Sequence, residues 1–490
     1  MEIDNTPQNK FKYVLLILYL IAVTVSFSLL FYGRAYDDPF ITYRYAQNLA
    51  KGLGFVYNPG LRVQSTITPF FTLILTAFYF IWRDIPHLAI ILGAFSLAWG
   101  AVFLWILSKS WQTPIVGWVG LLLYPTFPLL FSTLGSETPV YLAFCLGAYA
   151  FYSQKRYDLS AIFAALAVLT RPDGALVPII LAADYLIRIR KPIPWKSITI
   201  FLLLTLPWFL FAWVYFGSPI SATLAAKQQQ GGMAISQKFA PGLLTIFRPF
   251  ASNWFFWFEA LLALVGFIFM AMRARIWLLF IAWIGLYIIA FSLLGVSRYY
   301  WYYAPIIPGF VVLAGLGITA LANLVDRIQS RYDTKLVGVS HFSLLMSIVL
   351  ITALFLGRGI GIERLRHLAD TRLPIYRATG EWLKANTPND AKIGTLEVGV
   401  IGYYAERTIV GFAGLILPEV GKQLTFESTY EDAALWALSR YHPEYLVLHA
   451  GHFPRLEQGY VNDHCQAVQR FEGEPYSYHE DLIIFYCSQE

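Results

Sequence analysis

Long apolar segments recur through the first 360 residues, and they constrain the fold of this chain more than any other feature. A membrane-spanning helix needs about 20 mostly apolar residues, and fewer where other protein surrounds it. Such segments occur at 12–32, 88–108, 114–131, 139–153, 196–216, 254–272, 276–295, 303–321 and 341–357. A further apolar stretch, 159–188, is interrupted by Arg171-Pro172-Asp173-Gly174, and this turn predicts two short helices.

Composition supports a membrane protein and excludes several other classes. Hydrophobic residues make up 57% of the chain and charged residues only 13%, about half the charged share of a soluble protein. Disorder, coiled coil and nucleic-acid binding do not fit this composition. We therefore predict an α-helical polytopic membrane protein.

The segment 69–82 decides the predicted topology, because it is apolar over about 14 residues and is short for a span. If it lies along the membrane interface, about 11 spans remain and the basic loops fall on one side, as the positive-inside rule requires. We therefore expect a multi-pass protein of the cell (plasma) membrane with a cytoplasmic N-terminus. Its first external loop, 33–87, would carry 69–82 as an interfacial helix. The first apolar segment lacks a small-residue cleavage site and is expected to remain as an anchor.

Charge divides the chain into two parts. Residues 1–359 hold 25 basic and 12 acidic residues, a net +13, whereas 360–490 hold 11 and 18, a net −7. We therefore predict a transmembrane domain over 1–358 and a soluble extracytoplasmic α/β domain over 359–490. Strands are expected at 392–398, 407–413, 445–450 and 481–487, with helices at 375–386 and 430–440. The stretch 322–340 is expected to be a cytosolic connector.

Two cysteines of the tail domain flank a predicted terminal hairpin. Cys465 and Cys487 are equally far from its centre near Tyr476, so they could oppose one another and form a disulfide in an oxidising compartment. Two unpaired thiols remain the alternative. Cys145 lies within a predicted span and is expected to serve packing.

Motifs for nucleotide or metal binding are absent from the sequence. It contains no P-loop, GxGxxG fingerprint, HExxH or zinc-spaced set of cysteines and histidines. We therefore predict no metal site and no cofactor, and leave open a divalent cation that assists a reaction.

Charged residues instead recur at the external ends of the predicted spans. Asp37 and Asp38 follow the first span at membrane level, where adjacent carboxylates indicate a polar cavity. One of them could act as a general base, and an exposed acid pair at a helix end is the alternative.

Further charges lie in the later external turns. Glu137 precedes Pro139 and could simply face a helix N-terminus, while Arg171 and Asp173 could simply pair with each other. Lys227 and Arg298 come from later external loops, and cations gathered at membrane height suit a lipid-linked phosphate.

One motif resembles a known family. The stretch from Tyr36-Asp37-Asp38-Pro39 to Asn48-Leu49, continued by Gly52 to Asn58-Pro59-Gly60, is similar to the C-type (GT-C) integral-membrane glycosyltransferases. Within them it is closest to the arabinofuranosyltransferase-like bacterial branch that uses polyprenyl-phosphate sugars. Further similarities are Gly135-Ser136-Glu137-Thr138-Pro139, Leu169-Thr170-Arg171-Pro172-Asp173-Gly174, Arg298-Tyr299-Tyr300 and Gly399-Val400-Ile401-Gly402.

The resemblance covers nearly the whole chain and implies the GT-C fold, an external active site under the first loop, and catalysis by an aspartate of the Asp37-Asp38 pair. Three departures lie near the expected sugar site. Pro39 replaces a residue that is usually small in the family. Leu61 lies at the position after Asn58-Pro59-Gly60, where the family often has an acid. Gln64-Ser65 replaces a common Glu-Gly.

We therefore expect an inverting membrane glycosyltransferase of cell-envelope glycan biosynthesis. It would move a sugar from a polyprenyl-phosphate donor to an extracytoplasmic glycan, lipid or protein acceptor. Asp38 or Asp37 would be the base, and the lipid phosphate would bind to Arg171, Lys227 and Arg298.

Arg44 would orient the carboxylates, Glu137, Tyr43 and Asn58 would also contact substrate, and a loop at 227–232 could act as a lid. A transporter or flippase of lipid-linked sugars is the alternative, as is a non-catalytic glycan-binding membrane protein.

Overall fold

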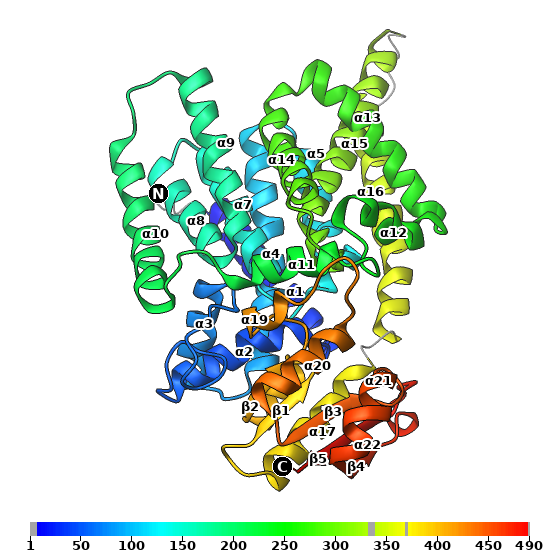
Figure 1. Ribbon diagram of the computed structural model, residues 1–490. Coiled ribbons are helices and arrows are strands. Elements are labelled where there is room, and N and C mark those ends of the chain that lie inside the picture. Colours follow the sequence, from blue (N-terminus) through cyan, green and yellow to red (C-terminus); the bar gives the residue numbers. More distant parts are fainter. Residues whose placement is uncertain (1–6, 332–338, 368–370, 489–490) are drawn as a thin grey trace.

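The apolar segments form the helical part of the molecule. The computed structural model describes residues 7–331, 339–367 and 371–488 (Figure 1). The predicted spans coincide with helices α1 (Pro7–Leu30), α4 (Ile85–Ser110), α5 (Pro114–Leu123), α7 (Thr138–Ser153), α8 (Tyr157–Thr170), α9 (Leu176–Asp184), α10 (Trp195–Phe216), α13 (Trp254–Arg273), α14 (Leu278–Leu294), α15 (Ile307–Arg331) and α16 (Val339–His367). Within the described residues, five helical segments are long and apolar enough to cross a membrane, and several shorter helices are also apolar. This is the helix set of a multi-pass membrane protein.

Three segments differ from the prediction. The span predicted over 114–131 is divided into α5 and α6 (Pro128–Phe131), because Pro125 directly follows the C-cap of α5 and, like Pro128, has no N–H to continue its hydrogen bonding. The connector predicted at 322–340 is helical as far as Arg331, and 332–338 lie outside the described residues. The lid loop predicted at 227–232 is the end of a helix, α11 (Ala222–Gly232), whose first turn is capped by the Ser221 hydroxyl.

Small residues allow the central helices to pack closely. A side chain added at Gly266 of α13 or at Gly317 of α15 would collide with the backbone of the opposite helix, at Leu313 and Leu262 respectively. Glycine at these positions therefore permits direct backbone contact between the two helices, a common packing mode in membranes.

Short helices lie between the membrane helices and the C-terminal part (Figure 1). They are α2 (Asp37–Ala50), α3 (Pro69–Tyr79), α11 and α12 (Phe239–Ala251). The expected interfacial segment 69–82 is helical over 11 residues, and it packs against α2, α4 and α8. Single turns of 3-10 helix occur at η1 (Pro172–Ala175), η3 (Arg275–Trp277), η4 (Tyr300–Tyr302), η5 (Ala304–Ile306) and η7 (Glu474–Tyr476), and π-turns at η2 (Tyr185–Ile189) and η6 (Glu457–Val461).

The C-terminal part is built around one mixed sheet of five strands in the order β2-β1-β3-β5-β4. The strands are β1 (Lys392–Thr395), β2 (Thr408–Gly411), β3 (Tyr445–His449), β4 (Cys465–Phe471) and β5 (Leu482–Cys487). Strand β1 runs parallel to β2 and β3, while β5 is antiparallel to β3 and β4. The helices are α17 (Arg372–Asn386), α18 (Val400–Ala405), α19 (Pro418–Gly421), α20 (Tyr430–Tyr441), α21 (Pro454–Leu456) and α22 (Asn462–His464).

The terminal hairpin carries a disulfide. Cys465 and Cys487 are directly opposed in the β4–β5 register and are bonded to each other. Cys145 is buried and has a free thiol, as expected of a packing residue.

Candidate functional site

The loop over 33–87 is bonded to the C-terminal domain through side chains that were predicted to belong to the site. The Arg44 guanidinium is buried and donates to the backbone carbonyls of Tyr57, Gly402 and Arg407. The Asn58 amide exchanges two hydrogen bonds with the backbone of Ile409, at 2.8 and 3.0 Å. Both residues therefore fix the loop to the domain.

Tyr43 is also used within the fold, since its hydroxyl donates to the Gly135 carbonyl and its ring is buried. We predicted that Arg44 orients the carboxylates and that Tyr43 and Asn58 contact substrate. In the structure, backbone groups are the hydrogen-bond partners of all three side chains.

Asp37 joins the same interface. Its carboxylate accepts the Gly399 N–H at 2.9 Å and the Val400 N–H at 2.7 Å, and these groups begin helix α18. An acid at a helix N-terminus is stabilised by free N–H groups and by the helix dipole. Burial nevertheless raises the pKa of Asp37 above its usual range, and the charge of Asp38 adds to this effect, whereas the bond from Val400 opposes it.

Asp38 points to a different partner. Its Oδ2 atom lies 3.1 Å from the Lys227 ammonium on α11, and about a third of its side chain is exposed, compared with 4% for Lys227. The Lys227 ammonium also lies 3.8 Å from the centre of the Tyr299 ring. Burial acts to lower the pKa of Lys227, but the charge and hydrogen bond of Asp38, together with Tyr302 and Tyr430, oppose this effect and the pKa is raised. Lys227 is therefore charged at neutral pH.

Three cavities meet at this ion pair. The first, which we call the helix cavity, has a volume of about 340 Å³ and a mostly apolar wall that includes Trp208, Phe209, Leu224 and Phe291. The second, the junction pocket, has a volume of about 60 Å³. Lys227 lines both of them.

The third cavity, which we call the domain cavity, lies against the C-terminal part. It has a volume of about 430 Å³, and its lining includes Asp37, Glu397, Tyr430 and the Tyr299–Trp301 aromatic turn. Asp38 lines both the domain cavity and the junction pocket. The Asp38–Lys227 pair therefore stands between an apolar cavity and a polar, aromatic one.

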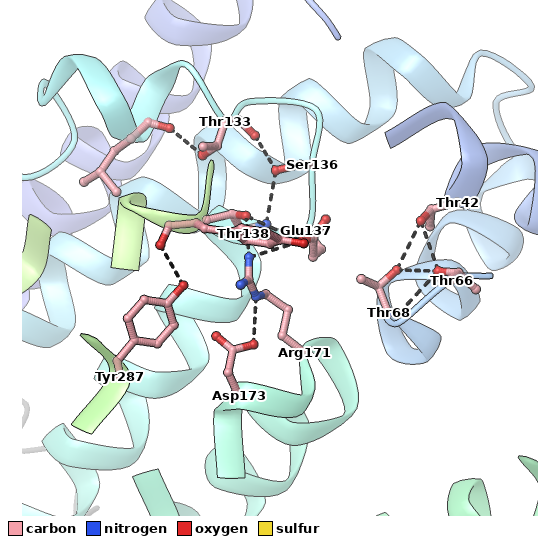
Figure 2. A network of polar contacts seen from close by, with 12 residues as sticks. Thr42, Thr66, Thr68, Thr133, Ser136, Glu137, Thr138, Arg171, Asp173 and Tyr287 are labelled. Carbon is pink, nitrogen blue, oxygen red and sulfur yellow. Dashed lines mark hydrogen bonds and ion pairs between the residues drawn. The ribbon is translucent and has the colours of Figure 1, made fainter. Parts of the chain in front are cut away.

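Arg171 forms a buried charge network beside the junction pocket (Figure 2). Its Nε lies 3.0 Å from Asp173, and its Nη1 lies 3.4 Å from Glu137 and 3.2 Å from the Thr138 hydroxyl. The Arg171–Asp173 ion pair, which was the alternative to a substrate-binding role, is thus present. Two carboxylates surround one guanidinium that is only 1% exposed, so the positive charge of Arg171 is already balanced.

The junction pocket has polar walls on more than one side. Glu137 lines it, and so do the mutually hydrogen-bonded hydroxyls of Thr42, Thr66 and Thr68 (Figure 2). Burial raises the pKa of Glu137, and the charge of Arg171 opposes the rise.

The three cations predicted to bind phosphate are divided by the structure. Arg171 and Lys227 line the helix cavity. Arg298 lines the domain cavity and donates to the Gln237 side chain at 2.7 Å. Arg298 therefore lines a different cavity from Arg171 and Lys227.

Glu397 is a site residue that the sequence analysis missed. It is half-buried in the domain cavity, just after strand β1. Burial raises the pKa of its carboxyl, and the negative charge of Asp37 adds to the rise, while Arg372 opposes it. Its position was a usable signal, because ligands of parallel sheets bind at the carboxyl ends of the strands.

Comparison with known proteins identifies the fold. A family model described as a domain of unknown function (DUF8728) matches residues 365–486. Curated protein sequences give no significant match. Among solved structures, the chain is similar to ArnT from Cupriavidus metallidurans in the apo state, with a TM-score of 0.62 and 14% identity over 97% of this chain and 98% of that one.

The same protein bound to undecaprenyl phosphate gives a TM-score of 0.61 and 15% identity, covering 96% of this chain and 97% of that chain. The likeness extends over the membrane helices and the C-terminal domain together. The chain therefore has the GT-C fold that the sequence resemblance implied.

Proposed function

We propose that this chain of GT-C fold is a membrane glycosyltransferase that moves a sugar from a polyprenyl-phosphate donor to an extracytoplasmic acceptor. The observation that carries the proposal is the position of the Asp38–Lys227 pair between an apolar cavity and a polar one. A transferase of this kind needs a lipid-compatible space for its donor and a wetter space for its acceptor. It also needs a base and a cation where the two spaces meet.

The helix cavity suits the donor lipid. Its wall is mostly apolar, which fits an isoprenoid chain, and Lys227 and Arg171 contribute the cations on that wall. Of the two, Lys227 is better suited to a phosphate, because it has one carboxylate partner whereas Arg171 has two. A solved structure of similar fold is bound to undecaprenyl phosphate, which supports a donor of this class.

Asp38 is the preferred base, because both oxygens of Asp37 already accept backbone N–H groups. A donor phosphate that bound Lys227 would compete for its ammonium and release the Asp38 carboxylate. Asp38 would then take the proton of an acceptor hydroxyl as its oxygen attacks the anomeric carbon. The bond from that carbon to the phosphate oxygen breaks on the opposite face, so the configuration inverts. Lys227 stabilises the charge on the departing phosphate.

The domain cavity suits the acceptor. Its lining alternates carboxylates with the aromatic side chains of Tyr299, Tyr300, Trp301 and Tyr430, and aromatic faces and acids are common partners of sugar rings and hydroxyls. The acceptor would be an extracytoplasmic glycan, lipid or protein, and the C-terminal domain would then lie outside the cytoplasm. The reaction as written needs no cofactor.

Binding of the donor lipid tests the proposal. Purified full-length protein is mixed with undecaprenyl phosphate or with undecaprenol, and lipid adducts are measured by native mass spectrometry. We expect the phosphate to be preferred and K227A to weaken its binding by about tenfold or more, as for loss of a charged hydrogen bond. The exposed Lys155 offers a matched control, K155A. Equal binding of the two lipids would overturn the donor assignment.

A flippase for lipid-linked sugars is the second candidate, since an apolar cavity beside polar groups suits transport as well. Transfer measured in detergent, with donor and acceptor on the same side, separates the two functions. A flippase would form no glycosidic bond under these conditions, whereas the proposed enzyme would.

A further inference from the structure

We propose that His449, His452 and Glu480 form a binding site for a divalent transition metal, best suited to Zn²⁺. The three ligand atoms all lie within 4.8 Å of one another in the C-terminal domain. This site lies outside the Asp38–Lys227 junction and does not depend on the function proposed above. It departs from our expectation of no metal site, which relied on the absence of familiar motifs.

The backbone holds the three side chains in place. His449 ends strand β3, and Glu480 lies just before β5, which is antiparallel to β3 with His449 opposite Leu482. The turn that carries His452 is fixed by the Glu457 carboxylate, which accepts the N–H groups of Gly451 and Phe453. The ligands are therefore brought together by the sheet and its turn, and no large movement is needed to bind an ion.

The distances fit a small metal ion. The Nδ1 atom of His449 lies 2.9 Å from Glu480 Oε2, and the Nε2 atom of His452 lies 3.3 Å from Glu480 Oε1. Ligands of a tetrahedral zinc ion at about 2.0–2.1 Å from the metal stand about 3.3 Å from one another. Imidazole is a donor that suits zinc and its neighbours rather than Mg²⁺ or Ca²⁺, and zinc also accepts a carboxylate ligand.

His449 provides the independent observation. Its side chain is only 8% exposed, and its Nδ1 atom is buried without a hydrogen-bond partner among the described residues, although Glu480 Oε2 lies 2.9 Å away. Buried polar atoms are rarely left unsatisfied. An ion between His449 and Glu480 would satisfy this nitrogen.

The other nitrogen of His449 is already engaged. Its Nε2 atom lies 3.0 Å from the Tyr376 hydroxyl. If Nε2 carries the proton and donates it to Tyr376, then the lone pair of Nδ1 faces Glu480 and His452, which is the arrangement of a metal-binding histidine.

A fourth ligand position remains for water or for His479. The Nε2 atom of His479 lies 3.1 Å from Glu480 Oε1, and its side chain is 77% exposed. His452 is 51% exposed, so the site is open on one side and ions can enter from solvent. Without an ion, the same residues would form only a histidine–glutamate ion-pair cluster.

Metal titration distinguishes these two states. Full-length protein with a histidine-free affinity tag is stripped with a chelator and titrated with Co²⁺, whose visible absorption reports tetrahedral coordination. We expect one Co²⁺ per chain, displaced by Zn²⁺, and an affinity lower by about 100-fold or more in H452A and E480Q, since even outer-shell changes cost 10- to 100-fold. His452 is largely exposed, so H452A should fold, and melting curves of each variant verify this.

His464, an exposed histidine on α22 of the same domain, supplies the matched control H464A, which should bind Co²⁺ as the wild type does. Zn²⁺ should also raise the melting temperature of the wild type and not that of H452A. Failure of the wild-type protein to bind one equivalent of Co²⁺ would overturn the proposal. Equal binding by the wild type and H452A would overturn it as well.

Discussion

The Lys227 ammonium lies 3.1 Å from the Asp38 carboxylate, although 189 residues separate the two in sequence. Lys227 lies on α11 and Asp38 in the first turn of α2, which begins directly after the first membrane helix. The contact joins the wall of the helix cavity to the wall of the domain cavity. The neighbouring Asp37 has a different task, and the two acids can therefore be separated by experiment.

Replacing Asp37 by alanine should lower the stability of the protein. The change removes an acceptor for the Gly399 and Val400 N–H groups at the start of α18, and loss of such a cap costs about 1 kcal/mol. We expect a lower melting temperature for D37A than for the wild type, measured by thermal unfolding in detergent. Equal melting temperatures for D37A and the wild type would show that the cap is not important.

Replacing Arg171 by glutamine should destabilise the membrane domain. The variant leaves Glu137 and Asp173 without their buried cation, and removal of one partner from a buried ion pair typically costs about 3–5 kcal/mol. We expect a reduced folded yield and a reduced free energy of unfolding. Arg83 is exposed, and R83Q is therefore the matched control, which should behave as the wild type.

Stability should depend on pH through Glu397. Burial raises the pKa of this carboxyl in the folded state above 4.5, its ordinary value. The folded chain then holds the proton more tightly than the unfolded chain. This contribution to stability is complete below pH 4.5 and is lost as the pH rises through the folded-state pKa.

The variant E397Q should lack this dependence. We expect the wild-type melting temperature, relative to that of E397Q, to fall as the pH is raised above 4.5. Glu427 is exposed, and E427Q is the control for a general effect of removing an acid. A difference between wild type and E397Q that stays constant with pH would contradict the assignment.

Thiol counting tests the terminal hairpin. Cys465 and Cys487 are bonded and Cys145 is free, so protein denatured without reductant should react with one equivalent of a thiol reagent. Replacing both paired cysteines by serine should lower the free energy of unfolding by about 3 kcal/mol in the loop-entropy model. Three reactive thiols in the unreduced wild-type protein would contradict the bridge.

The sequence allowed the fold to be predicted well, because length and apolarity determine which segments can cross a membrane. Helices occur at the predicted spans, and strands occur at the four predicted positions of the tail. Cys465 and Cys487, which are equally far from the predicted hairpin centre near Tyr476, are opposed in the sheet, as this spacing allowed. Where the prediction erred, as at 227–232, a polar run was read as a loop although a capped helix forms there.

The site was harder to predict, since a charge at the end of a span can face substrate or serve the fold. Asp38 and Lys227 were both selected from the sequence, and they meet. Arg44 and Asn58 carried equally suggestive chemistry, but their partners are backbone atoms of the C-terminal domain. The sequence alone could not locate that domain relative to the first loop, and this also explains why Glu397 was missed.

The most direct test of the account is turnover by D38N. Purified wild type, D38N and a control at the exposed acid Asp390, D390N, are incubated in detergent with a panel of undecaprenyl-phosphate pentoses and hexoses and with cell-envelope extract as the acceptor. Release of undecaprenyl phosphate is then measured.

We predict that the wild type and D390N turn over at least one donor. We predict that D38N is slower by about 10²- to 10⁴-fold while still binding undecaprenyl phosphate. A D38N rate equal to that of the wild type would contradict the account, as would a wild-type protein that turns over no donor in the panel.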